Sequence, residues 1–161
     1  MPDLITHVAV SHLIRRPYEL AKHKVGLPFR SLFYLGTILP DILTRPFYII
    51  FPATYNWTFP FHTLLGMGLT TLLLSQFFDA AIRKRAFINL AGGATLHFIV
   101  DALQIQIHGN NFWLFPFSWK NFSYGLATAG QMIEYIPYWI IGIIIFESMV
   151  YLIRKKRQVH S

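Results

Sequence analysis

The chain has 161 residues and a net charge of +7, and its composition is 54% hydrophobic and 17% aromatic with only 13% charged residues. A soluble domain typically carries about 25% charged residues, so this composition argues against an ordinary soluble protein. The chain has no cysteine, which excludes disulfides and thiolate metal sites.

The positive charge gathers in short clusters between apolar segments, most clearly at residues 83–85 and 154–157. Such clusters are typical of loops that stay on the cytoplasmic side of a membrane. We therefore expect the lipid bilayer, and no nucleic acid, as a partner of this chain. The length predicts a single domain over residues 1–161, and the charges predict a multi-pass protein of the cell membrane with a cytoplasmic C-terminus.

The first half of the chain predicts incomplete spans. Residues 1–14 are mostly apolar, but a helix of this length covers only about two-thirds of a bilayer. They predict a buried N-terminal half-helix that ends at the Arg-Arg-Pro sequence of residues 15–17. After a polar connector, residues 31–52 predict a helix broken or kinked at its glycine and prolines. Residues 53–60 predict an aromatic loop at a membrane interface.

The second half predicts longer helices. Residues 62–82, 86–107 and 131–153 are each apolar and long enough to cross a bilayer. Residues 109–130 are aromatic and almost free of positive charge, so we expect them outside the cell. No strand-like alternation is present, and the predicted fold class is all-α. The expected architecture is a multi-pass helical membrane protein with about four spans plus the N-terminal half-helix.

The segment 86–107 and the residue after it predict a polar face within an apolar helix. His97, Asp101, Gln104 and His108 are spaced at i, i+4, i+7 and i+11, which places them on one side of a helix. Imidazole and carboxylate groups one turn apart can hold a divalent metal. The alternative is a His–Asp hydrogen bond that only stiffens a buried interface.

Two further polar residues lie in apolar surroundings. Asp41 follows a proline inside an apolar segment, and His62 stands at the start of an apolar helix. An unpaired buried carboxylate is costly, and a cation shared with His97 and Asp101 would stabilise it. Separate explanations stay open at this point: Asp41 could cap a helix or pair with Arg45, and His62 could be a polar anchor at a helix start.

Short motifs follow one another along the chain in a characteristic order: Thr6-His7, Leu39-Pro40-Asp41, His62-Thr63-Leu64, His97-x3-Asp101 and Pro116-Phe117-Ser118. In this order they resemble the YdjM-type membrane-bound metal-dependent hydrolases. That family is related to zinc-dependent phospholipase C and to the zinc-dependent single-strand nucleases. The resemblance implies an all-helical fold around a site of one to three zinc ions. It also implies that this site hydrolyses phosphate esters.

The resemblance also implies roles for individual residues. The implied metal ligands are His7, Asp41, His62, His97, Asp101, His108 and Glu134. Four of them, from Asp41 to Asp101, would surround one metal, with His97 and Asp101 as the catalytic residues. Asp101 would bridge to a second metal shared with His7. His108 and Glu134 would form a third position.

The expected function is therefore a membrane-bound, zinc-dependent hydrolase of a phosphate ester. A site in or just above a bilayer would meet a phospholipid or a lipid-linked phosphate. Two alternatives remain: a non-catalytic membrane scaffold with a structural metal site, and a divalent-cation transporter with the same residues along its pathway. We also expect residues 1–14 to be buried and to turn His7, rather than His12, toward the metals.

Overall fold

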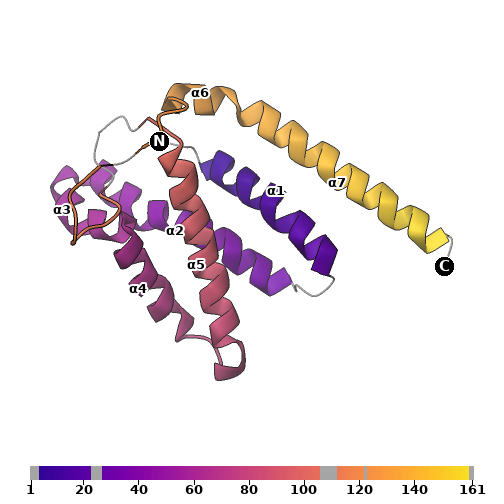
Figure 1. Cartoon of the computed structure of the whole chain (residues 1–161), viewed down its shortest axis with the longest axis horizontal. Coiled ribbons are helices and arrows are strands. Elements are labelled where there is room, and N and C mark those ends of the chain that lie inside the picture. The colour runs from indigo at the N-terminus through magenta and orange to yellow at the C-terminus, as the bar shows by residue number, and fades with distance from the viewer. Residues whose placement is uncertain (1–3, 23–26, 106–111, 122, 160–161) are drawn as a thin grey trace.

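The computed structural model describes residues 4–22, 27–105, 112–121 and 123–159. Over these residues the predicted all-α class is confirmed: the elements are helices, and the β-structure consists of one isolated bridge. The long helices in Figure 1 are α1 (Leu4–Lys22), α2 (Leu27–Ile50), α4 (Leu64–Ser75), α5 (Ala80–Ala102) and α7 (Ile136–Val159). The short ones are η1 (Pro52–Thr54), α3 (Tyr55–Thr58), η2 (Phe59–His62) and α6 (Ala129–Glu134).

The fold is centred on the crossing of α2 and α5, where two glycines let the backbones touch (Figure 1). A Cβ atom at Gly36 would overlap a backbone carbonyl of α5, and one at Gly93 would overlap a backbone carbonyl of α2. Only glycine avoids these overlaps, because it has no side chain. Asp41 and His97 lie about one turn beyond these glycines. The crossing therefore brings the two polar residues close together.

A small apolar core surrounds the crossing. α4 packs against α5 on one side, and α1 contacts α5 on the other (Figure 1). The buried core side chains are Leu39, Met67, Ala94 and Phe98, with Leu43, Leu74 and Trp113 packed against them. Many other large apolar side chains stay exposed on every long helix.

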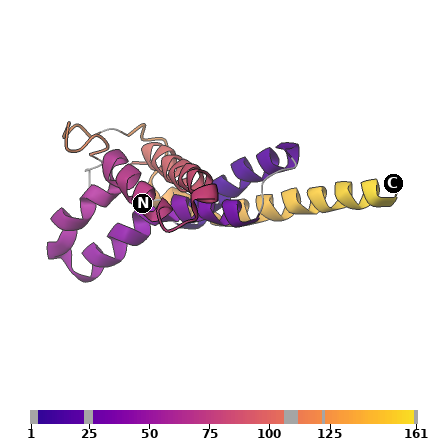
Figure 2. The same ribbon diagram turned by 90° about the horizontal axis from the view of Figure 1, so that it is seen from below.

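α7 is the most exposed long element. Residues Gly130–Ile153, which include most of α7, are long and apolar enough to cross a membrane, and only 6% of their most apolar stretch is buried. Both views show the C-terminal end of α7 reaching beyond the other helices (Figures 1 and 2). Among the described residues, this is the one predicted span that is both long enough and apolar enough to cross a membrane. The other helices do not confirm a multi-pass arrangement.

α7 is held to α1 by polar contacts. The Nε atom of Arg16 donates to Oε1 of Glu147 at 2.8 Å, and Nε2 of His12 lies 2.9 Å from the same oxygen. The other ring nitrogen of His12 lies 2.9 Å from the hydroxyl of Tyr34 on α2. Glu147 thus connects an apolar helix to the body of the protein.

Two helices are shorter than the sequence predicts. The span expected over residues 62–82 is α4, which has only 12 residues. It starts after Thr63, whose hydroxyl accepts a hydrogen bond from the backbone N–H of Gly66 and so caps the helix. α5 ends at Ala102 and does not reach residue 107.

The early end of α5 has a physical cause in the pairing of two backbone segments. The backbone N–H of Leu126 donates to the carbonyl of Leu103, and that of Ile105 donates to the carbonyl of Ala127. These bonds take the place of helical ones after Ala102. The predicted helical face therefore holds for His97 and Asp101 but does not extend further along the chain.

Three other local predictions were wrong, one of them only in part. α1 does not end at residues 15–17 but continues through Pro17, and the Arg15 Nε atom lies 3.3 Å from Oε1 of Glu19 along the same helix. α2 is one continuous helix that includes Pro40 and Pro46, so the predicted break is absent, whereas the predicted kink stays a prediction. The predicted loop 53–60 forms η1, α3 and the first part of η2.

Candidate metal centre

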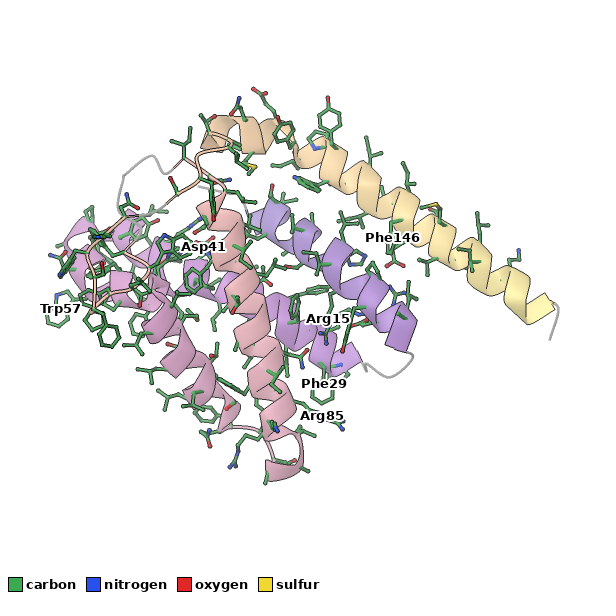
Figure 3. The ribbon with its side chains drawn as sticks, viewed as in Figure 1. Arg15, Phe29, Asp41, Trp57, Arg85 and Phe146 are labelled. Atoms are coloured by element: carbon green, nitrogen blue, oxygen red, sulfur yellow. The ribbon has the colours of Figure 1, made fainter. Side chains whose placement is uncertain are left out.

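Five of the predicted site residues meet in one buried cluster. His7 comes from α1, Asp41 from α2, His62 from the end of η2, and His97 and Asp101 from one face of α5. Possible ligand atoms of His7, His97 and Asp101 lie within 4.8 Å of one another, and so do those of Asp41, His62 and His97. Figure 3 shows Asp41 beside the C-terminal half of α5.

Asp101 lies between the two groups and offers one oxygen to each. Its Oδ1 atom is 3.5 Å from Nε2 of His7. Its Oδ2 atom is 3.3 Å from Nε2 of His62 and 3.4 Å from Nε2 of His97. If metal ions were bound, Asp101 could contact one ion through each of its two oxygens.

His97 lies close to each of the other two imidazoles of the cluster. The Nε2 atoms of His62 and His97 are 3.1 Å apart, and Oδ1 of Asp41 lies 3.6 and 3.7 Å from them respectively. The rings of His7 and His97 stack with their centroids 4.2 Å apart. Because His97 belongs to both groups, it is the geometric centre of the cluster.

The orientation of the His97 ring is fixed by a hydrogen bond on the side that faces away from the cluster. Its Nδ1 atom lies 2.8 Å from the backbone carbonyl oxygen of Thr37, so Nδ1 carries the hydrogen and donates it. The lone pair of His97 is then on Nε2, which faces His62 and Asp101. Metal-binding histidines are usually held in this way by a second partner.

Burial makes the carboxylates costly unless a cation compensates them. The side chains of Asp41 and Asp101 are 1% and 3% exposed. Among the described residues, neither oxygen of Asp41 accepts a well-aligned hydrogen bond. The Nε atom of Arg45 lies 2.7 Å from Asp41 Oδ1, so the predicted alternative of an Asp41–Arg45 pair is also present. Asp41 therefore contacts both the cluster and an arginine.

His62 lies at the edge of the cluster, in η2 and ahead of the first residue of α4, with 19% of its side chain exposed. Burial lowers its pKa, but the hydrogen bonds and charges of Asp101 and Asp41 outweigh this effect and raise the pKa from 6.5 to about 9. His62 therefore holds a proton at neutral pH. A metal that binds through Nε2 must displace this proton.

The ligand set suits a divalent metal of the zinc type. Three imidazole nitrogens and two carboxylates, without thiolate, match the ligands that zinc and similar ions use in proteins. The burial of Asp41 beside His62 and His97, and the fixed ring of His97, are consistent with such an ion. The buried cluster could thus hold one ion or two.

Two predicted ligands do not enter this cluster. His108 lies outside the described residues. Glu134 is exposed at the end of α6 and belongs to neither group. The expectation that His7 rather than His12 faces the cluster agrees with the structure, since His12 contacts Tyr34 and Glu147 instead.

Of residues 1–14, which were predicted to be buried, residues 1–3 lie outside the described part of the chain, and over residues 4–14 the burial holds for one face of α1 only. Thr6, His7 and Ser11 are buried, whereas Ile5 and Ile14 are about half exposed. The buried face points toward α2: the hydroxyl of Ser11 donates to that of Thr37 at 2.9 Å.

One contribution to the site, that of Thr37, was not found from the sequence, whereas Gln104 was predicted to lie on the same face as His97 and Asp101. The role of Thr37 is carried by its backbone carbonyl, which leaves no side-chain signal, although Thr37 stands one helical turn before Asp41. Gln104 is fully buried, and both polar atoms of its side chain have no hydrogen-bond partner among the described residues. Its backbone N–H donates to the carbonyl of Asp101, which places it next to the cluster.

The chain matches no known family model, no curated protein and no solved structure. The resemblance to the membrane-bound hydrolases therefore rests on the short motifs alone.

Proposed function

We propose that the protein is a membrane-bound, metal-dependent hydrolase of phosphate esters, of the kind that its motifs resemble. The observation that supports this most strongly is the position of Asp101 between two groups of possible ligands. A carboxylate facing two metal positions suits a multinuclear site. Such sites stabilise both the attacking and the leaving oxygen in phosphate ester hydrolysis.

The residues fit this chemistry. When bound, a zinc-type ion lowers the pKa of a water molecule toward neutrality and neutralises charge on the phosphoryl group. The chain itself holds the geometry: Thr37 orients His97, and the glycine crossing sets Asp41 against α5. In the reaction, water adds to phosphorus, the ester P–O bond breaks, and the alcohol leaves with a proton. No cysteine nucleophile is available.

The surface supports a bilayer as the environment of the site. Trp57, Phe77 and Phe117 are each more than four-fifths exposed, and exposed apolar side chains occur on every long helix. Soluble monomers rarely expose so much apolar surface. Together with the membrane-spanning character of Gly130–Ile153, this supports a protein that lies in a membrane. The basic clusters at residues 83–85 and 154–157 are the reason why we propose a multi-pass arrangement with a cytoplasmic C-terminus. The substrate we propose is a phospholipid or a lipid-linked phosphate.

The test combines metal content with turnover. Full-length protein is purified in detergent without chelator, and zinc is measured by elemental analysis alongside hydrolysis of chromogenic phosphate mono- and diesters. We expect at least one equivalent of zinc and activity that a chelator removes. His97→Ala and Asp101→Ala should lose both, whereas His160→Ala, in the basic C-terminal segment, should keep both. Zinc well below one equivalent in the unaltered protein contradicts the proposal.

The Asp41–Arg45 contact favours one other candidate, a membrane scaffold in which the cluster is structural. An arginine that neutralises Asp41 stabilises the fold without any chemistry. The two candidates differ in one result. Full zinc occupancy with no hydrolysis of any phosphate ester, together with a lower melting temperature after chelation, supports the scaffold.

A further inference from the structure

Arg45 is the cation that α2 places against the metal cluster. It follows Asp41 by one helical turn, and its Nε atom lies 2.7 Å from Asp41 Oδ1. The arginines in the second half of α1 have different partners: Arg15 and Arg16 pair with Glu19, and Arg16 also pairs with Glu147. Arg45 therefore differs from these two arginines in contacting a residue of the cluster.

The exposed fractions show which side of the cluster is open. The side chains of His7, Asp41, His97 and Asp101 are between 0% and 3% exposed. Those of His62 and Arg45 are 19% and 17% exposed. Among the described residues of the cluster and its arginine, these two reach the surface, so we place the entry of a ligand beside them.

Electrostatics gives Arg45 a reason to bind an anion. A divalent ion held by Asp41 would stand a few ångströms from the guanidinium, and the two cations would repel each other. An anion that contacts both removes this repulsion. A guanidinium is suited to this, because its planar N–H groups match the oxygens of a phosphoryl group.

We propose that Arg45 is the phosphate-binding residue at the mouth of the metal site. This rests on the proposed function, because the anion is the phosphoryl group of that substrate. Zinc and phosphate then strengthen each other's binding, by the same factor in both directions. The purely structural alternative is that Arg45 only neutralises Asp41. In that case its removal affects stability and zinc affinity but not the binding of an anion.

The experiment uses zinc-loaded full-length protein in detergent, with inorganic phosphate as the probe in isothermal titration calorimetry. Arg45→Gln is compared with Arg45→Lys, which keeps the charge but loses the planar N–H groups, and with Lys84→Gln as an exposed control at the far end of α5. We expect phosphate affinity to fall at least tenfold in Arg45→Gln, less in Arg45→Lys and not at all in Lys84→Gln. Zinc content should match the unaltered protein in all three.

The outcomes separate the two proposals. Protein that binds no zinc contradicts both. Zinc-loaded protein whose phosphate affinity is unchanged by Arg45→Gln contradicts the role of Arg45 and leaves the hydrolase intact. If Arg45→Gln does not fold, equal phosphate affinity in Arg45→Lys and unaltered protein contradicts the role of Arg45 in the same way. A competition arm identifies the source of the phosphoryl group: micelles containing phosphatidate displace phosphate if it is a lipid, and glycerol phosphate does so equally well if it is a soluble ester.

Discussion

The Nδ1 atom of His97 donates to the backbone carbonyl of Thr37 at 2.8 Å, and this bond connects α5 to α2 beside the point where the two helices cross. It decides which ring nitrogen of His97 faces the cluster. The position of the ligand therefore depends on the main chain of a neighbouring helix and not on a second side chain.

This hydrogen bond can be tested by replacing His97 with asparagine, whose amide keeps a donor for the Thr37 carbonyl but has no second ring nitrogen. In His97→Asn, the side-chain N–H can still donate to the Thr37 carbonyl, but no atom replaces Nε2. We expect zinc to be lost while the melting temperature stays within a few degrees of the zinc-free unaltered protein. In His97→Ala the bond is lost as well, which costs about 1 kcal/mol more. Elemental analysis and thermal unfolding in detergent measure both effects. Retention of zinc by His97→Asn would show that Nε2 is not a ligand.

The close contact of α2 and α5 predicts that the effect of a glycine-to-alanine substitution on stability depends strongly on its position. Gly36→Ala or Gly93→Ala must separate α2 from α5, so we expect destabilisation of about 1–3 kcal/mol, as for an overpacked core. Zinc binding should weaken too, because Asp41 and His97 move apart. Gly68→Ala and Gly142→Ala are matched controls, since a Cβ there meets no atom within 4 Å. Equal melting temperatures for Gly93→Ala and Gly68→Ala would refute this account of the crossing.

Zinc binding should release protons and weaken as the pH falls. The pKa of His62, raised to about 9, means that this residue is protonated at pH 7 before zinc binds. Between pH 6 and 9 the logarithm of the zinc association constant should rise with pH, with a slope of about one from this residue. Calorimetry in buffers with different ionisation enthalpies counts the released protons. A zinc affinity that does not change over this range contradicts the role of His62.

The contact between α1 and α7 predicts a stability effect that leaves the metal site intact. Glu147→Gln removes the charge that Arg16 and His12 contact, so we expect destabilisation of about 1 kcal/mol. Zinc content should not change, because the cluster residues come from other elements. Glu134→Gln, which changes an exposed carboxylate of the C-terminal part, is the control. A loss of zinc in Glu147→Gln would show that α7 supports the site.

Membrane orientation can be read from single cysteines, because the chain has none of its own. A cysteine at Asn121, which is exposed, should react with an impermeant reagent added outside intact cells. A cysteine at Ser161 should react only after the membrane is opened. The reverse labelling pattern would overturn the predicted topology.

The sequence predicted the part of the site that depends on local geometry. His97 and Asp101 share a face because α5 runs through both, and the cost of a buried carboxylate pointed to Asp41. The end of α5 was missed, because it depends on backbone pairing with residues more than twenty positions later. The length of α1 was missed as well, because the residues after Pro17 are held by contacts with other helices, such as the pair of Glu19 with Arg30 of α2, which a local reading of the sequence does not include.

Because α2 and α5 touch at glycines, the fold restricts the sequence strongly at these positions and weakly at the outward-facing ones. Outward-facing apolar residues can be exchanged for one another, since any large aliphatic or aromatic side chain serves at such a position. Gly36 and Gly93 tolerate no exchange without separating the helices. A lineage could therefore change most of its sequence and keep the site, provided that these two glycines and the cluster residues remain. In such a lineage, descent would be traced by a few fixed positions and their spacing rather than by overall identity.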